Sequence, residues 1–202
     1  MAKWEQITDG LWIVEGPNVR DMGFMFTTRM TVARLSDGPV WVNSPVLVSF
    51  ETLKRITELG PVRRLLAATP RHVWRLAALG DEPPQAWKDD FDQLAFKGNP
   101  LIAEVFFFHR RSRTVILDDL IQIHPMVKGK PFRNALFKLE GAVSPYGGLG
   151  VDIRLSFIHR DLARQSLKKL LSWDFDKLII GHGMCIETNA KAFAVRAFQW
   201  LM

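Results

Sequence analysis

The sequence predicts an α/β (α+β) protein in which two layers of β-sheet are covered by outer helices. Apolar runs of strand length alternate with amphipathic helical segments, and the order of strands, then helix, then strand occurs in each half of the chain. Two sheets that face each other, with helices on their outer sides, would bury the apolar faces of all these segments. A chain of 202 residues is expected to form a single domain, residues 1–202.

The elements of the first half are apolar runs that end at turn or capping residues. We expect a strand over 11–14 and a hairpin of 30–35 and 40–43 around Ser36-Asp37-Gly38. A helix is predicted over 49–59, because Ser49 can cap its start and Gly60 ends it. A strand over 62–68 follows.

The second half repeats this order. Segment 80–100 is rich in turn residues, and a second hairpin is predicted over 103–109 and 113–121 because of its β-branched and aromatic residues. The stretch 124–151 is expected to be a long irregular connection with a short helix over 132–139. A helix over 161–173, a buried strand over 177–180 and a last helix capped by Thr188 or Asn189 complete the chain.

Composition narrows the functional classes. No uncharged apolar run is long enough to span a bilayer, and the first residues lack the apolar core of a signal peptide, so a membrane is not expected as a partner. The single cysteine, Cys185, cannot form an internal disulfide, which predicts a cytoplasmic location. The net charge of +6 comes from short basic clusters, which we interpret as a solvated surface. Nucleic acid is therefore not the expected partner, and RNA binding stays a weaker alternative.

Polar residues follow three predicted strands. His72 comes after the strand that begins at Val62, Asp118 and Asp119 end the strand that begins at Arg113, and His182 follows Ile180. Strand ends often carry ligand sites, because the sheet is rigid while the polar tips stay free. Two imidazoles and a carboxylate could hold a divalent metal there. The alternative is that these residues only form turns.

Three motifs give the chain a resemblance to a known family. Gly181-His182-Gly183 after an apolar strand, Asp119 at the end of another strand, and the segment 69–75 resemble the metal-binding motifs of the metallo-β-lactamase superfamily. The resemblance extends from the strand at Leu11 to the last helix and implies a four-layer αββα sandwich. It is nearest to an uncharacterised branch of domains of unknown function, which shares Trp173-Asp174-Phe175-Asp176.

The chain departs from the superfamily's metal ligands at several positions. In the motif Thr-His-x-His-x-Asp-His, the first histidine falls on Pro70, the aspartate on Trp74 and the last histidine on Arg75, while His72 is kept. A further ligand histidine falls near Asn99, and asparagine is a poor ligand for transition metals. About half of a two-metal set is therefore left, and a dinuclear hydrolytic site is not expected.

These departures lead to one functional hypothesis and one alternative. We expect a degenerate cleft without metal or cofactor, in which Arg75 pairs with Asp118 or Asp119, and which binds a small molecule, an anion or a partner. The alternative is a hydrolase with one zinc or iron ion held by His72, Asp119 and His182. The cleft residues implied by the resemblance are His72, Trp74, Arg75, Asn99, Asp118, Asp119 and His182. The oligomeric state stays open.

Overall fold

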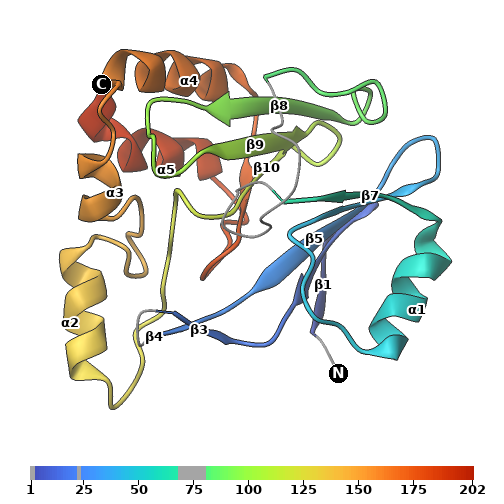
Figure 1. The fold of residues 1–202 in the computed structure, drawn as a ribbon, viewed down its shortest axis with the longest axis horizontal. Helices are drawn as coiled ribbons and strands as arrows, with labels where there is room; N and C mark the ends of the chain where they lie inside the picture. Colours follow the sequence, from blue (N-terminus) through green and yellow to red (C-terminus); the bar gives the residue numbers. More distant parts are fainter. Residues whose placement is uncertain (1–2, 22–23, 68–80) are drawn as a thin grey trace.

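Two β-sheets face each other, and helices cover their outer sides (Figure 1). The computed structural model describes residues 3–21, 24–67 and 81–202. Within these residues, the first sheet has the strand order β1-β2-β5-β6-β7 and the second has the order β11-β10-β9-β8. The N-terminal half of the chain forms the first sheet, and the C-terminal half forms the second.

The first sheet contains two hairpins, β1–β2 and β5–β6, and one parallel crossover. β5 and β6 are antiparallel, with Ala33 opposite Trp41, and α1 connects β6 to β7, which run parallel. Ser49 caps α1, since its hydroxyl accepts a hydrogen bond from the Thr52 N–H over 3.3 Å. The bounds are β1 (Trp4–Thr8), β2 (Leu11–Glu15), β5 (Arg29–Arg34), β6 (Val40–Asn43), α1 (Phe50–Leu59) and β7 (Val62–Leu66).

The second sheet combines an antiparallel meander with one parallel strand. β8, β9 and β10 follow one another antiparallel, and β11 lies parallel to β10 at the edge. The bounds are β8 (Phe91–Phe96), β9 (Glu104–His109), β10 (Thr114–Leu117) and β11 (Lys177–Ile180). Outside both sheets lie a short hairpin, β3 (Val19–Asp21) with β4 (Phe24–Phe26), and the helices α2 (Pro131–Leu139), α3 (Val151–Leu155), α4 (Arg160–Ser172), α5 (Ala190–Ala197) and the 3₁₀ turn η1 (Gln199–Leu201).

The strands alternate their side chains between two apolar layers. In β9, Val105 and Phe107 pack between the two sheets, whereas Phe106 and Phe108 pack toward the outer helices. This period of two is expected when both faces of a sheet are covered. Trp41 is fully buried between the sheets and stacks on Phe91, with ring centroids 4.6 Å apart. The three apolar layers of an αββα sandwich are thus each filled.

Most of the predicted elements are confirmed. The first hairpin, α1, the second hairpin, the short helix α2, α4 and β11 lie within a few residues of their expected positions. The prediction for 80–100 was wrong in part, because β8 forms there and pairs with β9 along its whole length. β1, the β3–β4 hairpin and α3 were not predicted from the sequence. Among the described residues, no helix is both long and apolar enough to cross a bilayer.

Two histidines are buried in this fold in the neutral form. Burial lowers the pKa of His109 and of His124 from the ordinary 6.5 to about 4. Nearby charges modify these shifts: Asp90 opposes and Arg111 reinforces the shift at His109, and Arg133 and His182 reinforce it at His124. Both imidazoles therefore have to gain a proton in a poorly solvated place when the protein is acidified.

We predict that these histidines destabilise the protein in acid. Because their pKa values are lower in the folded state, the unfolded chain binds more protons between about pH 6.5 and about pH 4, so stability present at neutral pH is lost over this window. The free energy of unfolding is measured with urea at pH ~7 and at pH ~4.5. Between these two pH values it should fall by about 2 kcal/mol less in H109Q than in the wild type. H159Q, at an exposed histidine, should lose as much as the wild type. Equal losses for H109Q and the wild type would contradict the prediction.

Candidate functional site

The candidate site lies where β10 and β11 end side by side. Leu117 pairs with Ile180 at the end of this parallel ladder, and the Gly181 N–H donates to the Leu117 carbonyl over 3.0 Å. The residues that follow, Asp118 and Asp119 on one strand and His182 on the other, therefore leave the sheet at the same edge. Asp118 is 2% exposed and Asp119 is 4% exposed, so both carboxyl groups need partners within the protein.

Asp119 and His182 are in direct contact. The His182 Nε2 lies 3.2 Å from the Asp119 Oδ1, and the His182 Nδ1 lies 2.8 Å from the Thr27 carbonyl oxygen. Because a carbonyl only accepts, Nδ1 carries a hydrogen, which fixes the tautomer and the ring orientation. Nε2 then faces the carboxylate either as the second N–H of an imidazolium or as a lone pair that shares a cation with Asp119.

Two close backbone approaches hold His182 in place. A Cβ at Gly181 would lie 2.9 Å from the Asp118 Cα and from the Asp118 carbonyl oxygen. A Cβ at Gly183 would lie 2.1 Å from the Ile123 carbonyl oxygen, and Gly183 has a φ of +101°, in the region that favours glycine. The glycines on both sides of His182 are therefore required by the packing of its loop.

Asp118 joins the two sheets. The Asn43 Nδ2 lies 3.3 Å and 3.4 Å from its two carboxylate oxygens, and the Ser44 hydroxyl donates to its Oδ2. Asn43 is the last residue of β6 in the first sheet and Ser44 follows it, whereas Asp118 follows β10 in the second. The Asn43 Oδ1 is buried and has no hydrogen-bond partner among the described residues. Asp118 is thus held by donors from the opposite sheet.

Glu104 is a buried carboxyl group that was not predicted from the sequence to belong to the site. It is 1% exposed and accepts hydrogen bonds from three successive backbone N–H groups, those of Asp118, Asp119 (3.1 Å) and Leu120 (2.7 Å). Burial raises the pKa of Glu104 well above its ordinary value, and the charges of Asp119 and Asp118 raise it further. Glu104 therefore shapes the turn that carries both aspartates. The sequence feature that could have pointed to Glu104 is a single acidic residue at the start of an otherwise apolar strand.

Arg29 is a buried cation beside this site that was also missed. It is 8% exposed, and its Nη1 donates to the Ile180 carbonyl (2.7 Å) and to the Cys185 Sγ (2.9 Å). Its Nη2 lies 3.9 Å from a carboxylate oxygen of Glu15. Burial raises the pKa of the Cys185 thiol, and the charge of Arg29 partly opposes this. Arg29 thus reaches from β5 to the loop that carries His182.

The other predicted site residues fall into two groups. His72, Trp74 and Arg75 lie outside the described residues. Asn99 is described, and its contacts are structural: its Oδ1 accepts from the N–H groups of Leu101 (2.9 Å) and Ile102 (3.1 Å), and its Nδ2 donates to the Ser156 hydroxyl (2.7 Å). None of these contacts involves Asp118, Asp119 or His182. The physical reason is topological, since Asn99 follows β8, two strands away from β10.

An aromatic cluster covers one side of His182. The Phe26 ring on β4 lies 6.0 Å from the His182 ring and 5.5 Å from the His124 ring, edge to face in both cases. Phe137 on α2 continues the cluster, with centroids 4.4 Å from His124 and 6.1 Å from Phe26. The β3–β4 hairpin and α2 therefore bound the site from the side of both histidines.

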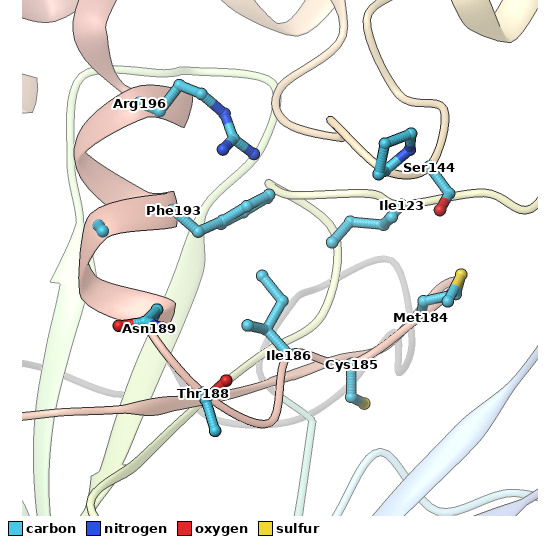
Figure 2. Close-up of a pocket in the computed structure, with 11 residues that line it drawn as sticks. Ile123, Ser144, Met184, Cys185, Ile186, Thr188, Asn189, Phe193 and Arg196 are labelled. Atoms are coloured by element: carbon cyan, nitrogen blue, oxygen red, sulfur yellow. The ribbon is translucent and has the colours of Figure 1, made fainter.

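A separate hollow of about 500 Å³ lies beyond the loop after His182. Figure 2 shows Ile123, Ile186 and Phe193 pointing toward one another across it, with Arg196 at its rim. The guanidinium of Arg196 lies 4.9 Å from the Phe193 ring centroid and donates to the Tyr146 carbonyl over 2.7 Å. The walls are mostly apolar, and Asp119 and His182 do not line this hollow, so it offers contact area and few groups that would orient a ligand.

The fold is similar to that of solved metallo-β-lactamases. A metallo-β-lactamase from Erythrobacter litoralis matches with 12% identity and a TM-score of 0.63, over 99% of this chain and 92% of that chain. The DIM-1 metallo-β-lactamase matches with 12% identity and a TM-score of 0.60, over 100% and 98% of the two chains. A fragment of the diflavin flavoprotein A 5 from Nostoc sp. matches with 13% identity and a TM-score of 0.58, over 99% and 96%.

These likenesses define the class of protein by its fold. The chain has the metallo-β-lactamase fold, and the αββα sandwich expected from the sequence is confirmed. No protein-family model matches the chain, and no curated protein matches it. At 12–13% identity the likeness extends to the fold alone, so the chemistry has to be argued from the side chains of the site.

We predict that G183A destabilises the protein more than G38A does. Gly38 has the same φ of +101° but no neighbour within 4 Å of its added Cβ, whereas the Cβ at Gly183 would collide with the Ile123 carbonyl. G38A should lower the free energy of unfolding by about 1 kcal/mol, because of its backbone conformation alone. G183A should lower it by at least about 2 kcal/mol more. Chemical unfolding of both variants measures the difference. Equal losses would mean that the loop of His182 is not held by this close approach.

We also predict that E104Q is destabilising although it replaces a buried carboxyl group with a neutral amide of nearly the same size. The side-chain amide can accept through one atom only, so at least one of the N–H groups of residues 118–120 is left facing another donor. The expected loss in unfolding free energy is about 1–3 kcal/mol. E82Q serves as the control, because the Glu82 side chain is 89% exposed and the change should cost less than about 0.5 kcal/mol. Wild-type stability for E104Q would show that these hydrogen bonds do not hold the turn.

Proposed function

We propose that this chain is a metallo-β-lactamase-fold protein without the two-metal hydrolase activity, and that its cleft binds a ligand instead. The observation that carries the proposal is that protein groups engage the carboxylates at the site. Asp119 contacts His182, Asp118 accepts from Asn43 and Ser44, and Glu104 accepts from three backbone N–H groups. Buried carboxyl groups with such partners have their hydrogen bonds satisfied within the protein without a bound ion.

The donor set also supports this proposal. Among residues 3–21, 24–67 and 81–202, no group of three His, Cys, Asp or Glu side chains is arranged to hold a metal ion. Within these ranges, Asp119 and His182 would supply two ligands, one fewer than a mononuclear catalytic site needs. In the sequence, Pro70, Trp74 and Arg75 replace the other ligands implied by the resemblance. These residue types do not provide a second metal position.

The charges at the site favour one kind of ligand. Among the described residues, Asp118, Asp119 and Glu104 bring carboxyl groups to this edge, against the cation Arg29 and the imidazole of His182. A small anion would be repelled by the nearby carboxylates. We therefore favour a polar small molecule that donates hydrogen bonds or carries a positive charge over a small anion, which was one of the ligands expected from the sequence.

One observation favours the alternative of a mononuclear metal-dependent hydrolase. The separation of 3.2 Å between the His182 Nε2 and the Asp119 Oδ1 is close to the ~3.3 Å between two ligands of one tetrahedral zinc ion. The Nδ1–H of His182 donates to a backbone carbonyl, as the second nitrogen of a metal-bound histidine commonly does. His72 would have to be the third ligand. The zinc or iron ion would supply the activation of water for hydrolysis.

Metal content and thermal stability distinguish the two functions. If the proposal holds, purified protein incubated with zinc, iron or manganese and then desalted retains far less than one ion per chain. A chelator then leaves the Tm unchanged, and a polar ligand found by thermal shift stabilises the protein equally with and without chelator. Such a ligand should lose its effect in H182N and keep it in H159N, which alters an exposed histidine.

The opposite result would replace the proposal by the alternative. It consists of about one ion per chain in the wild type and in H159N, its loss in H182N, and a Tm that the chelator lowers. Hydrolysis of a model ester that depends on the same ion would complete that case.

A further inference from the structure

The surface around the start of α2 combines exposed apolar side chains with lysines. Met126 is 59% exposed, Phe132 is 77% exposed and Leu139 is 77% exposed. Lysines are interspersed among them, and residues 124–139 contain four basic and no acidic residues. We call this the basic α2 surface, which consists of Met126, Val127, Lys128, Lys130, Phe132, Lys138 and Leu139, all exposed.

Hydrogen bonds hold this surface in one conformation. The Asn134 side chain brackets the backbone of Val127, because its Oδ1 accepts from the Val127 N–H (3.0 Å) and its Nδ2 donates to the Val127 carbonyl (2.8 Å). The Arg133 Nη1 donates to the Pro125 carbonyl over 3.1 Å, and its guanidinium lies 4.6 Å from the Phe137 ring centroid. The loop before α2 is thus fixed on the helix, with its apolar side chains directed outward.

The position of the surface suits contact with an extended partner. In Figure 1, α2 and the loop before it form an outer corner of the molecule, beyond the ends of both sheets. The inner face of α2 buries Phe137 against Phe24, Phe26 and His124. The outer face presents Phe132, Ala135 and Leu139, which recur at the spacing of one side of a helix.

We propose that the basic α2 surface docks on an anionic lipid bilayer. Exposed apolar side chains at a protruding corner can enter the boundary between headgroups and acyl chains, while the lysines remain at the level of the negative headgroups. The charge of this segment complements such a surface, since no carboxylate in it opposes the contact. From the sequence, a membrane was not expected as a partner, because no segment is apolar and long enough to span a bilayer. Docking on the bilayer surface needs no such segment, and the proposal replaces that expectation.

Two other partners fit these observations less well. Single-stranded RNA is bound through several exposed aromatic rings along a basic groove. The residues of the basic α2 surface include one aromatic ring, that of Phe132. A protein that binds an amphipathic helix encloses the apolar stripe in a groove. Here the apolar side chains continue from the helix into the preceding loop at Met126 and Val127, which gives a broad protruding surface suited to a flat partner.

Co-sedimentation with vesicles tests the proposal on the whole protein. The wild type should sediment with vesicles of phosphatidylcholine and phosphatidylserine, and much less with phosphatidylcholine alone. Raising NaCl from about 0.05 M to about 0.5 M should weaken the binding, because salt screens the lysines. K128E/K130E should weaken binding by about tenfold or more, and F132S by about tenfold.

Matched variants elsewhere on the surface serve as controls. Phe50 on α1 is 76% exposed, almost the same fraction as Phe132, so F50S should bind like the wild type. K54E/K168E makes the same change in net charge at two other exposed lysines and should weaken binding much less than K128E/K130E. The proposal is overturned if the vesicles are not bound, if both charge reversals act equally, or if F132S and F50S act equally. Binding of an acidic protein or of RNA through this surface, without binding of vesicles, would also overturn it.

Discussion

The burial of three carboxyl groups at one sheet edge constrains much of the surrounding structure. Glu104, Asp118 and Asp119 are nearly without solvent contact, and each has to be compensated from within the protein. The compensating groups come from different parts of the chain: backbone N–H groups of the same turn, Asn43 and Ser44 from the opposite sheet, and His182 from the neighbouring strand end. The two sheets and the loops between them are thereby joined at one point.

The loop of His182 depends on the same constraint. Its imidazole reaches Asp119 only because the glycines on either side let the backbone pass close to Asp118 and Ile123. Arg29 then crosses from the first sheet to the carbonyl of Ile180, directly before this loop. A cation at this position keeps the carbonyl and the Cys185 sulfur hydrogen-bonded in a poorly solvated place. The described residues of the site are therefore bonded to one another and to the surrounding backbone.

The layers of the fold are stabilised independently of the site. Apolar side chains alternate between the space inside the two sheets and the space under the helices, and this burial is the main stabilising contribution in a domain of this size. Proteins with 12–13% identity share the architecture, because many apolar sequences with the same periodicity fill the same layers. Residues at the strand ends can change without loss of the fold.

Local patterns in the sequence were sufficient for a large part of the architecture. The β5–β6 hairpin follows from two apolar runs around a turn, and α1 follows from its periodicity together with Ser49 and Gly60, since each of these signals acts over a few residues. The same reasoning placed Asp118, Asp119 and His182 at strand ends. The strand β8 was missed because its partner β9 supplies the hydrogen bonds, and its own segment is rich in turn residues.

Only the tertiary structure decided which of these polar groups meet. Glu104 accepts hydrogen bonds from N–H groups more than ten residues later in the chain. Arg29 donates to a carbonyl 151 positions later. The sequence predicted Asn99 for the cleft, and only the structure shows that its side chain bonds to Leu101, Ile102 and Ser156. The sequence by itself thus determined most of the elements and the polar character of their ends. The pairing of buried charges depends on long-range contacts, which no local pattern encodes.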